Sequence, residues 1–358
     1  MRAAISRYLP APSIAALALV ATVALAGCGS DDPGGGTTVR TSTTNGPRTS
    51  SPVKLVYLAD SPYGKATTAD QLRAGVATLK RRARLLGLPG TAIRTRGQSK
   101  IAITYPPEDF VKPASSQLPV QGRLLFYDFE ADLIGSDEPI PDIFEAVTRA
   151  SKRPAVDSPD NTTGRQYYLF GGLRNYRGGP TGNRDALLAK FNGKLPADSE
   201  IKTVQPGTVV VLAKPLANSL DSKQFDGDYI LQDRPQLDNT GIAAPKFSDA
   251  SGKPAVAFQF TPDGRRRLQR MTARIAGRGL AAGNDSAPGT FAVVLDNQIL
   301  SRAAVDPKQY PKGLDGGEGA EVSGDINEQQ ARALAAVLES GPLPFRLIPL
   351  LQTQVQSG

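Results

Sequence analysis

Apolar and polar positions follow the most regular pattern in the last third of the chain. The run 255–260 (AVAFQF) predicts a strand, and Thr261-Pro262-Asp263 then supplies an N-cap, a proline at the first helical position and an acidic first turn. Two further apolar runs, 291–295 and 298–304, flank Asp296-Asn297, a pair that tolerates the positive φ angles of a two-residue hairpin turn. This part of the chain is therefore predicted to hold a strand, a long helix and a β-hairpin.

Similar signals mark elements elsewhere. Thr68 with Gln71, and Asn327 with Gln330, have the spacing of capping boxes, and a glycine follows each apolar helical stripe. The other predicted strands lie at 54–59, 91–96, 100–105, 122–129, 208–213, 320–324 and 343–348, and shorter helices at 141–152 and 184–191. The strand, helix and hairpin before residue 106 form the first half of a ferredoxin-like unit.

The N-terminal segment has the three parts of a bacterial lipoprotein signal. Basic Arg2 and Arg7 precede an uncharged stretch, 14–27, which is too short to cross a bilayer comfortably, and Leu25-Ala26-Gly27-Cys28 forms a lipobox. We expect cleavage before Cys28, a diacylglyceryl group on its sulfur, and a lipid-anchored protein at the extracytoplasmic face of the cell membrane. The alternative is an ordinary secreted protein whose cysteine falls there by chance.

The composition sets the net charge of the chain and excludes several kinds of catalytic and metal site. The 358 residues include 42 basic and 34 acidic side chains, a net charge of +8, and removal of Arg2 and Arg7 with the signal would leave +6. This surplus suits an anionic membrane surface or wall polymer but selects neither. The chain has no histidine and only one cysteine, so serine–histidine and cysteine–histidine nucleophiles and zinc sites of histidine or thiolate are excluded. We expect no enzyme activity, cofactor, metal or nucleic-acid partner.

Three passages, taken in order, carry a family resemblance. Residues 291–301 read FAVVLDNQILS, residues 319–324 read GAEVSG ahead of the final helix, and residues 71–105 include Arg81-Arg82 and Leu86-Gly87. They resemble both ends of the first large extracytoplasmic domain of SecD, an accessory subunit of the bacterial protein-export channel. The resemblance covers about 68–105 and 229–348, with a weaker match at 122–129.

The resemblance implies an α+β fold, with a split ferredoxin-like (βαββαβ) base and an inserted α+β head subdomain. The SecD family continues into transmembrane helices that couple proton flow to head movement, and we expect this chain, without such a bundle, not to transduce a proton gradient by itself. The expected layout is a signal peptide at 1–27, a disordered Gly/Ser/Thr stalk at 28–52, the first part of the base at 53–132, an insertion at 133–201, a base strand and connection at 202–225, the head at 226–324, the base C-terminal helix and strand at 325–350, and a tail at 351–358.

The resemblance also implies a function. A membrane-anchored module would bind exported or unfolded polypeptide and assist Sec-dependent translocation, with Sec translocase components as partners. The alternative is a cell-envelope scaffold or wall-polymer-binding lipoprotein without an export role, and the basic helix face is more typical of a solvated surface than of a binding site. The expected polypeptide-binding residues, on the 262–278 helix and the 291–304 hairpin, are Arg266, Arg270, Phe291, Val293 and Ile299.

Overall fold

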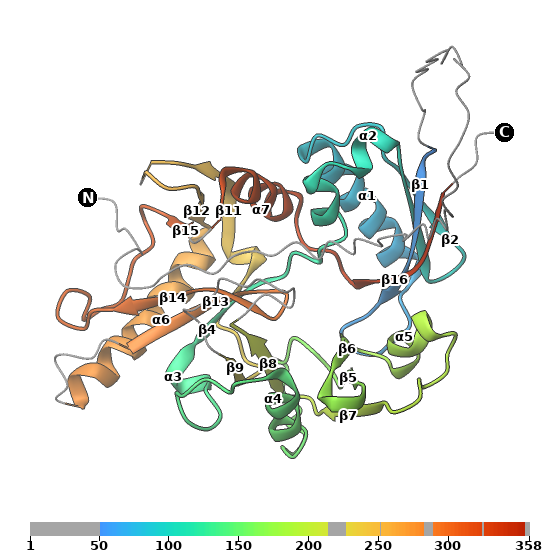
Figure 1. The fold of residues 1–358 in the computed structure, drawn as a ribbon. Helices are drawn as coiled ribbons and strands as arrows, with labels where there is room; N and C mark the ends of the chain where they lie inside the picture. Colours follow the sequence, from blue (N-terminus) through green and yellow to red (C-terminus); the bar gives the residue numbers. More distant parts are fainter. Residues whose placement is uncertain (1–50, 214–226, 251, 283–288, 324–325, 355–358) are drawn as a thin grey trace, which may run out of the picture.

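The computed structural model describes residues 51–213, 227–250, 252–282, 289–323 and 326–354 (Figure 1). Cys28, the signal segment and the stalk up to residue 50 lie outside these residues. The described residues form four sheets and seven α-helices, so the predicted α+β class is confirmed. A search of the same residues finds no helix with the length and apolarity needed to cross a membrane.

A four-stranded antiparallel sheet with the order β16-β1-β3-β2 forms the base. Helix α1 lies between β1 and β2 in the chain and α7 precedes β16, which gives the βαββαβ order of a ferredoxin-like unit. Both predicted capping boxes are present, at Thr68 for α1 and at Asn327 for α7. The base elements are β1 (Val53–Asp60), α1 (Ala69–Leu85), β2 (Ala92–Arg96), β3 (Lys100–Tyr105), α2 (Pro107–Phe110), the 3-10 helix η1 (Pro113–Gln117), α7 (Glu328–Ser340) and β16 (Arg346–Gln354).

A six-stranded sheet with the order β10-β4-β13-β14-β8-β9 forms the centre of the molecule. Its strands are β4 (Leu124–Asp128), β8 (Thr208–Leu212), β9 (Asp228–Gln232), β10 (Leu237–Asp238), β13 (Gly289–Leu295) and β14 (Gln298–Val305). The predicted hairpin is present, with positive φ at both Asp296 and Asn297.

The placement of two strands differs from the expectation. We expected the strands at 122–129 and 208–213 in the base, but β4 pairs with β13, and β8 pairs with β9 and β14. Every residue of β4 and β8 is buried. A strand covered on both faces has a continuous apolar sequence, and such a sequence does not indicate which sheet it joins.

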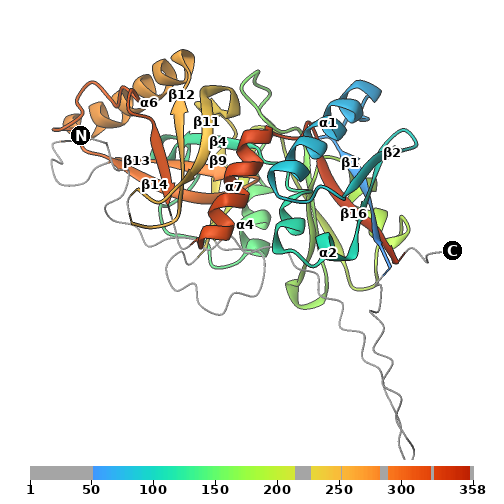
Figure 2. The ribbon, with the colours of Figure 1, turned by 90° about the horizontal axis from the view of Figure 1, so that it is seen from above.

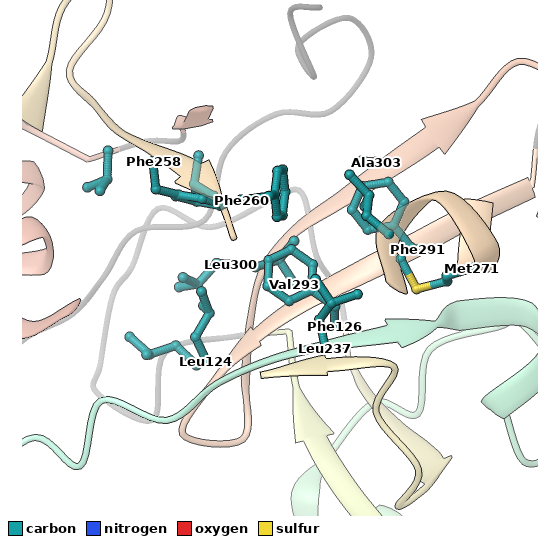
Figure 3. Close-up of a cluster of buried hydrophobic side chains, with 14 of the residues drawn as sticks. Leu124, Phe126, Leu237, Phe258, Phe260, Met271, Phe291, Val293, Leu300 and Ala303 are labelled. Carbon is teal, nitrogen blue, oxygen red and sulfur yellow. The ribbon is translucent and has the colours of Figure 1, made fainter. Parts of the chain in front are cut away.

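One face of this six-stranded sheet packs on the head core (Figure 3). Phe126 of β4 packs at 6.4 Å from Phe291 and at 6.3 Å from Phe260, measured between ring centroids. Met271 of α6 also belongs to this cluster. The covering elements are η4 (Asn239–Gly241), β11 (Ile242–Ser248), β12 (Ala255–Phe260), α6 (Pro262–Ala281) and β15 (Ala320–Ser323).

Helix α7 belongs to the base by its place in the chain, yet it also packs on the head. It lies between α1 and β11 (Figures 1 and 2), and its Leu334 and Leu338 are part of the head core. Apolar residues are buried along most of its length. Because it has no wide polar face, α7 can cover base and head together.

The segment at 133–201 adds a three-stranded sheet with the order β6-β5-β7. The helices predicted at 141–152 and 184–191 are present there. Strand β6 was not predicted, because it contains Gly178-Gly179-Pro180 and these residues are uncommon inside strands. Asp233 joins this segment to the central sheet, since its carboxylate accepts hydrogen bonds from the backbone and hydroxyls of Thr162 and Thr163. Its elements, with α3 before them, are α3 (Phe129–Asp132), α4 (Ile143–Ala150), β5 (Gln166–Phe170), η2 (Gly172–Arg174), β6 (Tyr176–Thr181), α5 (Arg184–Leu188), η3 (Ala189–Phe191) and β7 (Glu200–Val204).

Arg82 of α1 binds the two chain segments that run between base and head. Its side chain is fully buried and donates hydrogen bonds to the carbonyls of Leu118 and Val120 on one segment. It also donates to Ser340 Oγ at 2.9 Å and to the Gly341 carbonyl at 2.8 Å on the other. Burial lowers the pKa of the guanidinium to about 10, which still leaves it charged at neutral pH.

Candidate functional site

Helix α6 places a row of arginines beside the head core. Thr261 caps its N-terminus by accepting a hydrogen bond from the Gly264 N–H at 3.0 Å. A buried stripe that includes Leu268, Met271 and Ile275 fixes how the helix is rotated. At 1.5 Å per residue, the row spans about 16 Å along the helix axis. The row consists of Arg267, Arg270, Arg274 and Arg278.

This arginine row forms one wall of a groove of about 590 Å³. The other residues of the groove come from β4 and α3, from the loop before β5, and from the connection between β9 and β10. They are Asp128, Ala131, Asp132, Asp160, Arg234, Pro235 and Gln236. We call this feature the arginine groove.

Two buried carboxylates in the arginine groove form ion pairs. Asp128 accepts two hydrogen bonds from Arg278, at 2.9 and 2.5 Å, and Asp132 accepts one from Arg234 Nε at 2.5 Å. The Asp128 and Asp132 side chains are 5% and 1% exposed, whereas their arginine partners are nearly half exposed. Each ion pair therefore joins a buried carboxylate to a guanidinium group that is partly exposed to solvent.

The remaining arginines differ in how they are held. Arg274 donates to Gln236 Oε1, and Arg267 lies 2.8 Å from an Asp263 carboxylate oxygen. Arg270 is exposed, and no hydrogen bond or ion pair among the described residues involves its guanidinium. Arg270 is thus a cation of the groove that has no protein partner among the described residues and is open to a ligand.

Asp132 makes the stability of the folded chain depend on pH. Burial raises the pKa of its carboxyl from 3.8 to about 6, although Arg234 acts in the opposite direction. A raised folded-state pKa means that the folded chain binds a proton more tightly than the unfolded chain between pH 4 and 6. Protonation of Asp132 should therefore raise the free energy of unfolding by up to about 3 kcal/mol as pH falls from 7 to 4.

Urea unfolding of wild type and Asp132→Asn at pH 7 and pH 5 measures this contribution. We expect the wild-type chain to gain more stability than Asp132→Asn on acidification. Asp60 in the base, whose pKa burial also raises to about 6, supplies a similar dependence that remains in both chains. Asp160→Asn, an exposed aspartate in the same groove, should keep the wild-type dependence. Identical pH responses of wild type and Asp132→Asn would contradict the assignment.

The hairpin residues expected to touch polypeptide are not on the surface. Phe291, Val293 and Ile299 are 1%, 4% and 1% exposed, so their proposed contact role is corrected to packing. Phe291 and Val293 face the head core, and Ile299 faces the core on the other side of the sheet. The apolar runs of the hairpin did not indicate which side chains are exposed, and strands on both sides of β13 with packing on both faces bury them.

The two predicted arginines have different surroundings. Arg270 lines the arginine groove, while Arg266 is exposed outside it and lies 3.2 Å from Asp263. Sequence reasoning missed Asp128, Asp132 and Arg234, since they come from segments distant from α6 in the chain. Only the arginine spacing on α6 could have indicated one wall of the groove.

Comparison with known proteins shows what parts of the chain are similar to. Residues 216–345 match the family model described as the SecDF P1 head subdomain. A protein translocase subunit SecD from Acidaminococcus fermentans is 30% identical over 128 residues, which is 36% of this chain and 25% of that protein. This chain carries a SecD-family P1 domain.

Another protein translocase subunit is also similar to this chain. SecDF from Brucella abortus is 31% identical over 183 residues, 49% of this chain and 22% of that protein. The chain therefore spans about a quarter of the length of its curated SecD relatives. A solved structure described as a membrane component SecDF that enhances protein export gives a TM-score of 0.46 at 18% identity, covering 85% of this chain and 99% of that one.

Proposed function

We propose that this protein is a lipid-anchored extracytoplasmic module that binds exported or unfolded polypeptide and assists Sec-dependent protein translocation. The observation that carries the proposal is the match of residues 216–345 to the SecDF P1 head subdomain. The matched relatives are protein translocase subunits, and the lipobox at Cys28 supplies an anchor on the extracytoplasmic side.

The position of β15 at the end of the head sheet, in the part of the chain that the structure describes, supports polypeptide binding. Within the described residues, β15 pairs with β12 alone and ends the three-stranded sheet of the head. An extended chain can add to such an edge through backbone hydrogen bonds, which depend little on the side-chain sequence of the client. The edge of β15 therefore replaces the buried hairpin as the proposed polypeptide contact.

Gene deletion followed by pulse-chase of a secreted protein tests the proposal. We expect slower release of the mature secreted protein and accumulation of its precursor, because the head would no longer bind the emerging chain. Expression of the wild-type chain in the deletion strain should restore release, while Cys28→Ser should not. Unchanged export kinetics in the deletion strain would contradict an export role.

A further inference from the structure

The lining of the arginine groove is unlike that of a site for unfolded polypeptide. Eight of its eleven lining residues are charged, and its apolar side chains are limited to Ala131 and Pro235. Binding grooves for apolar ligands are lined mainly by hydrophobic and aromatic side chains. The groove therefore suits a polar, charged ligand, independently of any polypeptide bound at a strand edge.

The charges of the groove favour an oxyanion. Arg278 and Arg234 neutralise the two buried aspartates, and Arg267 is paired with Asp263 outside the groove. Arg270 and Arg274 then remain without a carboxylate partner among the described contacts, although exposed Asp160 lies on the rim. Residues four apart on a helix are neighbours, so both guanidinium groups can reach one ligand. Guanidinium forks match the paired oxygens of a phosphate.

A second observation points to a hydrogen-bond donor on the same ligand. Asp132 lines the groove, and its Oδ2 atom is buried with no hydrogen-bond partner among the described residues. Arg234 uses only the other carboxylate oxygen. A buried acceptor without a donor is costly, and a ligand hydroxyl can satisfy it.

We propose that the arginine groove binds a phosphodiester that carries hydroxyl groups, of the glycerophosphate class. Arg270 and Arg274 hold the phosphate oxygens, and a ligand hydroxyl donates to Asp132. A groove of about 590 Å³ is large enough for more than one such unit. The same chemistry occurs in the headgroup of phosphatidylglycerol and in soluble polyol phosphates, so the experiment includes both sources.

Titration calorimetry of the full chain with glycerophosphoglycerol tests the site. The chain carries Cys28→Ser, so that a lipid anchor cannot contribute to vesicle binding. Arg270→Gln should weaken binding about tenfold, the effect of one charge-assisted contact. Arg266→Gln is the matched control, since it removes the same charge from the same helix outside the groove, and it should change affinity by less than about twofold.

Three comparisons decide the outcome. Dimethyl phosphate, a diester without hydroxyl groups, should bind several-fold more weakly; equal affinity would overturn the role of Asp132. Equal losses for Arg270→Gln and Arg266→Gln would overturn the groove as the site, provided that both variants keep the wild-type unfolding midpoint. Tighter binding of poly-L-glutamate would overturn the phosphodiester in favour of acidic polypeptide.

Vesicle flotation identifies the source of the phosphodiester. Arg270-dependent flotation with phosphatidylglycerol vesicles, and not with phosphatidylcholine vesicles, supports a lipid headgroup. Calorimetric binding of glycerophosphoglycerol without flotation supports a soluble polyol phosphate. The absence of both signals would overturn the proposal without affecting the export role, which the pulse-chase experiment tests separately.

Discussion

Replacing Arg82 with methionine should destabilise the folded chain by about 3–5 kcal/mol, because several buried polar groups would lose their donor together. The carbonyls of Leu118, Val120 and Gly341 each accept a hydrogen bond from this one side chain. Methionine fills similar volume but donates nothing. Arg82→Lys should lose most of the same stability, since an ammonium cannot reproduce the planar guanidinium fork.

Urea unfolding at pH 7 measures the loss. Arg81→Met is the matched control: Arg81 is the preceding residue, its side chain is 54% exposed, and it lies 3.6 Å from Glu339. An exposed pair of this kind contributes about 0–1 kcal/mol, so the control should remain close to wild type. A loss under about 1 kcal/mol for Arg82→Met would show that water or neighbouring donors satisfy the carbonyls instead.

Replacing Cys28 with serine should move the protein from the membrane fraction to the soluble fraction. The lipobox predicts a diacylglyceryl group on this sulfur, and serine cannot carry that thioether. Two acyl chains give stable anchoring, while a chain without them keeps only weak surface attraction. Membrane fractionation followed by immunoblotting measures the distribution.

Ser30→Ala is the control for this experiment, because it changes a nearby residue and leaves the lipobox cysteine in place. The unfolding midpoint of Cys28→Ser should equal that of wild type, because Cys28 is expected to begin the Gly/Ser/Thr stalk, whose composition supplies few apolar side chains to a core. Retention of Cys28→Ser in the membrane fraction, with a normal midpoint, would contradict lipid anchoring as the means of attachment.

Local signals in the sequence predicted most elements but not all their partners. Capping boxes at Thr68 and Asn327 identified the starts of α1 and α7, because caps depend on residues three apart. The sheet joined by β4 depends instead on a pairing with β13, more than 150 residues later. Both faces of β4 are covered, so its sequence has no alternation that would indicate a partner.

The candidate site, like the sheets, could be predicted only where the signal is local in the sequence. The spacing of arginines on α6 predicted a basic face, and Arg270 does line the groove. The buried aspartates of the groove could not be predicted, because an acidic residue at the end of a strand or in a short helix is usually solvated. Their importance follows from tertiary packing, which takes Asp132 out of water and leaves one of its oxygens without a donor.

The antiparallel pairing of β1 with β16 has a consequence for how the molecule can be divided. Val53 lies opposite Gln354 and Asp60 opposite Arg346, so the first and last described strands close the chain into a ring. A single proteolytic cut in the head would open this ring without releasing a fragment, because each half remains held by its own strand in the base sheet. Releasing the part of the chain between the two segments that Arg82 binds would require two cuts, one on each of these segments.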